Sequence, residues 1–164
     1  MPGALALLPQ YAGLEDPVAD LRAACRSAVA WLGSDAVVLA APQGRRVGEH
    51  LLAEGGFEAR ALGARAPEPP DEPAYLVVGN GSAKRSTTSP GYVDERALGF
   101  DADLGARLRD GDLAGIDHGL AGELWADTAA LGELADALPP GCLGTIDYDD
   151  DPYGVQYWVV RWEW

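Results

Sequence analysis

Two short, uninterrupted apolar runs constrain the fold more than any other feature of this sequence. They lie within residues 35–41 and 75–79, and both are too short for a typical helix. A run of this kind is typical of a strand that is buried on both faces. Helical patterns flank the first run, at 16–32 and 46–54. Strands that alternate with helices predict an α/β fold, which we expect to be a three-layer sandwich with a mixed or mostly parallel central sheet flanked by helices.

Local signals mark the ends of further elements. Asp16 is expected to cap the first long helix, Pro17 to take its first position and Gly33 to end it. With 164 residues and no internal repeat, the chain suits a single domain over 1–164. The other expected segments are strands at 4–8, 142–147 and 155–164, helices at 94–109, 117–126 and 128–138, and loops at 41–44, 60–73 and 80–91.

The charge of the chain argues against two classes of partner. With 12 basic and 26 acidic residues its formal net charge is −14, whereas nucleic acids and anionic membranes attract basic surfaces. No apolar run of about 18 residues is present to span a bilayer. No Lys or Arg precedes Arg22, so we expect no signal peptide and a cytoplasmic protein. Cys25 and Cys142 form no paired motif and are expected to be buried, reduced thiols.

The loop after the second apolar run carries the first candidate site. Gly79, Asn80, Gly81 and Ser82 follow the expected strand, and ligands bind at the carboxyl ends of strands in open α/β sheets. Next come Lys84, which is the only lysine, and Arg85, two cations that could hold a carboxylate or a phosphate. The loop has neither the GxGxxG pattern nor the Walker lysine spacing. The alternative is a solvated loop whose cations pair with nearby Asp and Glu side chains.

An acidic cluster at 147–151 begins like a calcium-binding loop. However, Pro152 replaces the glycine that such a loop requires, and Trp158 replaces its final glutamate. We therefore interpret this cluster as a charged turn between strands.

The two histidines each precede a glutamate on a helical pattern. His50 lies four residues before Glu54, and His118 lies before Glu123, but neither pair includes the further close ligand of a zinc motif. Surface or helix-terminal histidines are the expected outcome, and we expect no metal and no cofactor. A metal site rebuilt from His50, His118 and Glu123 is the alternative.

The end of the chain is rich in aromatic residues that alternate along the expected last strand. One side of this strand is expected to be core, and a helix or a second subunit would cover the other. The residues concerned are Tyr157, Trp158, Trp162 and Trp164.

Four segments, taken in order, resemble the catalytic B subunits of class III extradiol ring-cleavage dioxygenases and the related Memo-like proteins. Residues 2–9 read Pro-Gly-Ala-Leu-Ala-Leu-Leu-Pro, where the family has a strand and Pro-His-Pro-Pro. Residues 37–44 end in Pro-Gln-Gly, where the family has Ser-Pro-His-Gly. Residues 77–101 contain Gly-Asn-Gly-Ser-Ala-Lys-Arg and a later Phe-Asp, and residues 152–157 read Pro-Tyr-Gly-Val-Gln-Tyr. The resemblance implies a single α/β domain with a mixed sheet between helices.

The resemblance also implies that the family's iron chemistry is absent. In the enzymes, two histidines and a glutamate hold iron(II), and a further histidine acts as acid and base. The two ligand histidines correspond to Gly3 and Gln43 here, the acid–base histidine to Lys84, and the glutamate to Glu123 at a different spacing. Glycine offers no side-chain ligand, and an amide is a weak one beside imidazole or carboxylate.

Three functional hypotheses follow. The first is a metal-free, non-catalytic relative of the dioxygenase fold that binds a small acidic or aromatic molecule at the strand ends, with Lys84 as an anion anchor or a base. The second is an interaction protein that forms a homo-oligomer through its aromatic last strand. The third is an enzyme with the rebuilt metal site. The ligand-binding residues of the first hypothesis are Gln43, Asn80, Ser82, Lys84 and Arg85.

Overall fold

The strands form a small parallel sheet and a separate hairpin. The computed structural model describes residues 1–11, 15–60 and 74–164. Within these residues, β1 (Ala36–Leu39), β2 (Ala59–Arg60) and β3 (Tyr75–Val77) make a parallel sheet in the order β2-β1-β3. Strands β4 (Thr145–Asp150) and β5 (Tyr157–Arg161) pair antiparallel.

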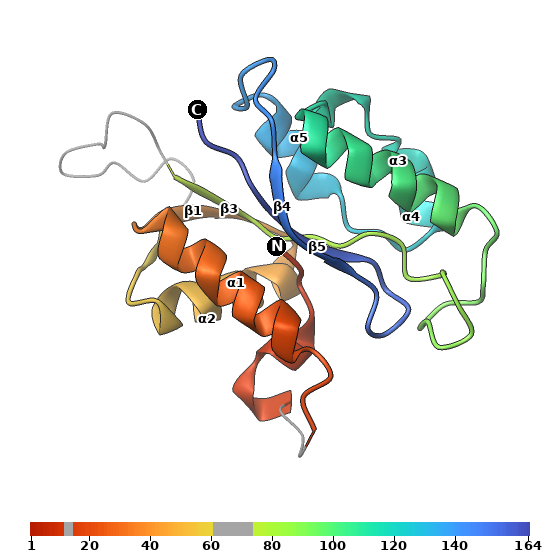
Figure 1. Cartoon of the computed structure of the whole chain (residues 1–164), viewed down its shortest axis with the longest axis horizontal. Helices are drawn as coiled ribbons and strands as arrows, with labels where there is room; N and C mark the ends of the chain where they lie inside the picture. Colours follow the sequence, from red (N-terminus) through yellow and green to blue (C-terminus); the bar gives the residue numbers. More distant parts are fainter. Residues whose placement is uncertain (12–14, 61–73) are drawn as a thin grey trace.

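Helices cover both sides of the strands, with α1 and α2 on one side and α3, α4 and α5 on the other (Figure 1). This arrangement confirms the predicted α/β sandwich. Adjacent strand residues point into two cores: Val38 and Leu76 pack with α1 and α2, whereas Leu39 and Val77 pack with α3 to α5. The helices are α1 (Ala19–Leu32), α2 (Pro42–Glu54), α3 (Ala97–Asp110), α4 (His118–Glu123) and α5 (Ala129–Ala135), with 3₁₀ helices at Leu5–Leu7, Pro9–Tyr11 and Leu113–Gly115.

The last strand follows the same alternation. Tyr157 and Val159 belong to the core under α1, and Trp158 belongs to the core under α3 to α5. The sequence left open whether a helix or a second subunit covers the second face of this strand. Helices of the same chain cover it, because each face packs against its own helical layer.

The predicted strand at 4–8 is wrong. Leu5–Leu7 is a 3₁₀ helix, and the extended segment is Met1–Gly3, which runs parallel to the end of β3. The Met1 amino group donates to the Val77 carbonyl at 2.8 Å, and the Gly79 N–H donates to the Met1 carbonyl at 2.9 Å. A short apolar run without alternation does not distinguish a strand from a buried helical turn, which explains the error.

Other boundaries also differ from the expected ones. The loop expected at 41–44 is the start of α2, because Pro42 occupies the first helical position, where its missing N–H costs nothing. The acidic cluster lies mostly in β4, so the charged-turn interpretation holds only for its last residue, Asp151. Charged side chains on such an edge strand discourage pairing with another sheet. The loop expected at 60–73 falls outside the described residues beyond Arg60, which belongs to β2.

Both cysteines are free and buried, as predicted. Burial raises the pKa of the Cys25 thiol to about 11, so this thiol stays protonated near neutral pH. Across the described ranges, none of the helices has the length and apolar character needed to cross a bilayer.

Replacing Gly99 with alanine should raise the free energy of unfolding by about 0.5–1 kcal/mol, because alanine is the better helix former. Gly99 lies within α3, and a Cβ there would meet no atom within 4 Å. The matched control is Gly56→Ala, where the new Cβ also finds open space but φ is +83°. That variant should be less stable than the native protein. Urea denaturation measures both, and equal effects of the two variants would contradict this account.

Candidate functional site

The glycine-containing loop after β3 holds the fold together through its main chain. Loops that cradle phosphate need free N–H groups. Here each N–H from Gly79 to Ala83 already donates to an acceptor elsewhere in the chain. Their acceptors are, in order, the Met1, Asp127 and Gln156 carbonyls, the Asp101 carboxylate and the Leu124 carbonyl.

A buried ionic network extends from this loop. The Ser82 side chain is fully buried, and its hydroxyl donates to the Asp101 carboxylate at 2.5 Å. Arg85 donates to the same carboxylate at 2.7 Å and to Asp151 at 2.7 Å. Burial opposes the charge on Arg85, but hydrogen bonds to both aspartates outweigh it and raise the pKa of the guanidinium. The geometry therefore gives Ser82 and Arg85 structural contacts. Arg85 pairs with aspartates, as the alternative predicted, but these partners are distant in the sequence, and Ser82 and Asp101 are buried rather than solvated.

Two of the other predicted binding residues, Asn80 and Lys84, lie beside an exposed tryptophan, Trp125, that sequence reasoning missed. Lys84 Nζ lies 5.1 Å from the centre of the Trp125 ring, and the Asn80 amide donates to the Trp125 carbonyl at 3.3 Å. Trp125 has a φ of +59°, a conformation that bulky side chains rarely adopt. The Gln43 amide instead donates to the Gly3 carbonyl at 3.1 Å. No sequence pattern predicts the positive φ of Trp125.

The residues of the rebuilt metal site do not come together. His50 is on α2 and lies 3.8 Å from Glu54, on the opposite side of the strands from α4. His118 Nδ1 lies 2.9 Å from the Thr128 hydroxyl, and Glu123 accepts a hydrogen bond from Arg96 at 2.8 Å. Among the residues with described positions, no group of three His, Cys, Asp or Glu side chains is placed to hold a metal ion.

Acid should destabilise the protein as the pH falls from about 4 to about 2. Hydrogen bonds from Arg96 lower the pKa of Asp94 from its ordinary 3.8 to about 2, so the folded state binds this proton less readily than the unfolded state. The stability that Asp94 contributes is therefore present above about pH 4 and disappears as pH falls through 2. Urea midpoints measured at several pH values check this. Asp94→Asn should show the shallower decline, and parallel curves would contradict the assignment.

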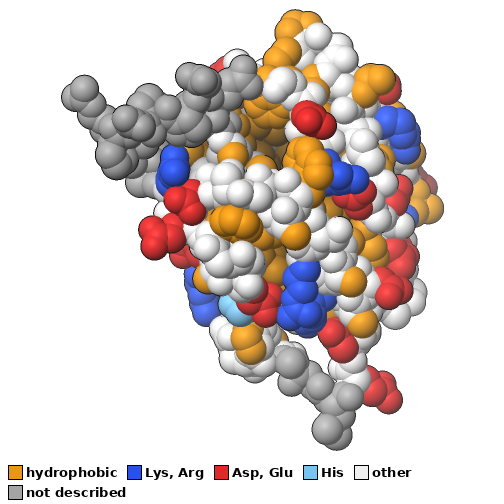
Figure 2. Space-filling model, turned by 60° about the vertical axis from the view of Figure 1, so that its left-hand side comes forward, with side chains coloured by type: hydrophobic (Ala, Val, Ile, Leu, Met, Phe, Trp, Pro, Cys, Tyr) orange, Lys and Arg blue, Asp and Glu red, His pale blue; other side chains and the backbone are white. Residues whose placement is uncertain are grey.

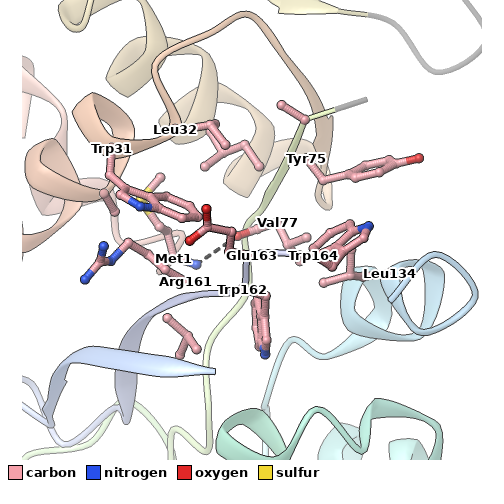
Figure 3. Close-up of a pocket in the computed structure, with 14 residues that line it drawn as sticks. Met1, Trp31, Leu32, Tyr75, Val77, Leu134, Arg161, Trp162, Glu163 and Trp164 are labelled. Carbon is pink, nitrogen blue, oxygen red and sulfur yellow. Dashed lines mark hydrogen bonds between the residues drawn. The ribbon is translucent and has the colours of Figure 1, made fainter. Parts of the chain in front are cut away.

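A groove of about 240 Å³ lies beside β3, and we call it the aromatic groove. The end of α1 and the last residues of the chain form its walls, and the edge of β3 forms its back (Figure 3). Hydrophobic side chains also surround a hollow in the space-filling view (Figure 2). The lining residues are Met1, Ala28, Trp31, Leu32, Ala74, Tyr75, Leu76, Val77, Leu134, Val160, Arg161, Trp162, Glu163 and Trp164.

Four aromatic side chains from three separate parts of the chain line this groove. Trp31 comes from α1, Tyr75 from β3, and Trp162 and Trp164 from the C-terminal segment. Trp31 is 40% exposed and Trp164 is 43% exposed, so both keep accessible surface. The Trp162 indole N–H donates to the Leu108 carbonyl at 3.0 Å, which holds that ring in place. The sequence indicated the two C-terminal tryptophans but not the two residues that join them.

Arg161, which lines the groove, already interacts with other residues of the protein. The Arg161 guanidinium makes two hydrogen bonds to Asp147, one of them at 2.8 Å, and lies 5.1 Å from the Trp31 ring centre. Its charge is therefore balanced within the protein. Glu163 is an acidic residue on the wall of the groove (Figure 3).

Comparisons of this chain with protein-family models, with curated proteins and with solved structures find no match. The resemblance to the extradiol dioxygenases therefore rests on the four sequence segments alone.

Proposed function

We propose that this protein is a non-catalytic binding protein that holds a flat aromatic group in the aromatic groove. The observation that carries this proposal is the convergence of four aromatic side chains on one groove of about 240 Å³. Aromatic pairs gain about 0.5–1.5 kcal/mol beyond the burial of their surface, so several rings around one space favour a ring as the ligand.

The composition of the groove favours the binding of an apolar ring. Apart from the Met1 amino group, Arg161 and Glu163, its described lining is apolar or aromatic. Binding sites for small molecules are usually apolar hollows with few polar groups, and this groove has that character.

Membership of the extradiol dioxygenase-like group remains a proposal from the resemblance. It agrees with an aromatic ligand and with the loss of metal ligands at Gly3 and Gln43. The aromatic groove, however, lies along β3 and includes neither of these positions. We therefore place the binding site away from the strand-end cleft that the sequence suggested.

We further propose, from its net charge of −14, that the protein does not bind nucleic acid. Its free, buried cysteines favour a cytoplasmic location, which we also propose. A homodimer through the last strand is the weaker alternative. One edge of β5 is paired with β4, so β4 is the strand that this hairpin presents on that side. Because β4 exposes aspartates along its length, two copies that paired through β4 would oppose like charges.

Calorimetric titration with p-cresol tests the proposed function. We expect binding, and we expect Trp164→Ala to weaken it about 2- to 10-fold, the value of one aromatic contact. Tyr92→Ala is the matched control, because this ring is 96% exposed and lies outside the groove. Cyclohexanol should bind more weakly than p-cresol. Absence of p-cresol binding, or an equal loss in both variants, would refute the proposal.

A further inference from the structure

We propose that the occupant of the aromatic groove is an extended segment of a partner protein, which pairs through its main chain with the open edge of β3. Its aromatic side chain would lie among the groove's rings. This inference rests on the proposed function and names the source of the aromatic group.

The first argument is the direction of the β3 main-chain groups. The Val37 N–H donates to the Ala74 carbonyl and the Val78 N–H donates to the Leu39 carbonyl, both at 2.9 Å. Successive residues of a strand alternate in direction, so the N–H and C=O of Tyr75 point away from β1 and toward the groove. In the part of the chain that the structure describes, these two groups have no hydrogen-bond partner.

The second argument is the occupancy of the neighbouring stretch of the same edge. Met1–Gly3 already runs parallel to the chain at 77–79 and forms hydrogen bonds there, including one from the Gly3 N–H to the Gly79 carbonyl at 3.3 Å. The edge therefore accepts an extended chain beside Val77. A peptide segment in the groove would continue the same line of pairing past Tyr75.

The third argument is the character of β3 itself. Leu76 and Val77 are buried in the two opposite cores, which is the pattern of an interior strand of a parallel sheet. In the described sheet β3 is nevertheless the outer strand, next to β1 only. Open edges of this kind are templates for an added strand, which gains affinity from main-chain hydrogen bonds and specificity from alternate side chains.

Charge decides the kind of segment. The protein carries a net charge of −14, and Glu163 lies on the groove wall. The two cationic groups of the lining already have partners, Arg161 in Asp147 and the Met1 amino group in the Val77 carbonyl. A segment with basic residues flanking its aromatic residue is therefore favoured over an acidic one. Side chains alternate along a strand, so the aromatic residue and its second neighbours face the same side.

A capped pentapeptide, Lys-Val-Tyr-Val-Lys, tests this inference by calorimetry against the full chain. Its control is the same peptide with two main-chain nitrogens methylated, which keeps the tyrosine ring but removes two donors. We expect the methylated peptide to bind at least tenfold more weakly than the unmodified peptide. Binding of p-cresol to the same protein is the reference that shows an intact groove. Glu163→Lys should weaken the unmodified peptide severalfold more than it weakens p-cresol, because only the peptide carries the positive charges that this carboxylate attracts.

The outcomes separate this inference from the proposed function. If both peptides bind equally and p-cresol binds, the ring alone is recognised, and the pairing with β3 is wrong while the proposed function stands. If neither peptide binds and p-cresol does not bind, both this inference and the proposed function are wrong. Self-association of the protein that the peptide displaces would identify a second copy as the occupant and overturn the inference.

Discussion

Replacing Asp101 with alanine should lower the free energy of unfolding by about 3–5 kcal/mol, the usual cost of removing one partner of a buried ion pair. The Asp101 side chain is only 2% exposed and accepts hydrogen bonds from the Ser82 main chain, the Ser82 hydroxyl and Arg85. The substitution leaves a mostly buried guanidinium and two buried donors without their acceptor. Buried donors without an acceptor destabilise the folded state by more than the net stability of the hydrogen bonds that are lost.

The matched control is Asp151→Ala, which removes the other carboxylate from the same arginine. Asp151 is 39% exposed, so water replaces its single bond and the cost should stay below about 1 kcal/mol. Urea denaturation compares the two variants. If Asp101→Ala does not fold, Asp101→Asn keeps the shape and should still lose more stability than Asp151→Ala. Equal losses for the two positions would contradict the importance of burial.

Replacing Gly79 with alanine should cost about 3 kcal/mol, at the upper end of the range for overpacking a core. A Cβ at Gly79 would overlap the main-chain oxygen of Asp127. That oxygen cannot move away easily, because Asn80 and Asp127 exchange two main-chain hydrogen bonds at 3.1 and 3.0 Å. The new methyl group must therefore break this pairing or displace the end of β3.

Gly122→Ala is the control for Gly79→Ala, because a Cβ at Gly122 meets no atom within 4 Å. This variant should be as stable as the native protein or slightly more stable, since Gly122 lies in α4. Thermal unfolding followed by circular dichroism distinguishes the two. If Gly79→Ala and Gly122→Ala have the same melting temperature, the contact with Asp127 does not constrain residue 79.

The sequence predicts the α/β layers better than it predicts where α2 begins and what the N-terminal segment forms. The runs around β1 and β3 were recognisable because they are apolar at every position, which two covered faces require. The proline at the start of α2 suits a loop and a first helical position equally, so the sequence predicts a loop where the helix begins. At the N-terminus, the apolar residues carried no period that separates a strand from a turn of helix.

The candidate site was less predictable because it joins distant parts of the chain. Arg85 meets Asp101 and Asp151, which are 16 and 66 residues away. A sequence pattern reports neighbours on one helix face or strand and carries no information on such pairs. The C-terminal tryptophans were visible as a group, but Trp31 and Tyr75 join them only through the packing of α1 and β3.

The loop from Gly79 to Ala83 has a further consequence for how the protein folds. Its five amide donors reach four separate segments, at Met1, Asp101, 124–127 and Gln156, so none of these bonds can form from local structure alone. Contacts between distant segments raise the contact order, which slows folding because the chain loses entropy before such contacts stabilise it. The same amides open together only when those segments separate, so their hydrogen exchange reports the global unfolding of the molecule rather than local fraying.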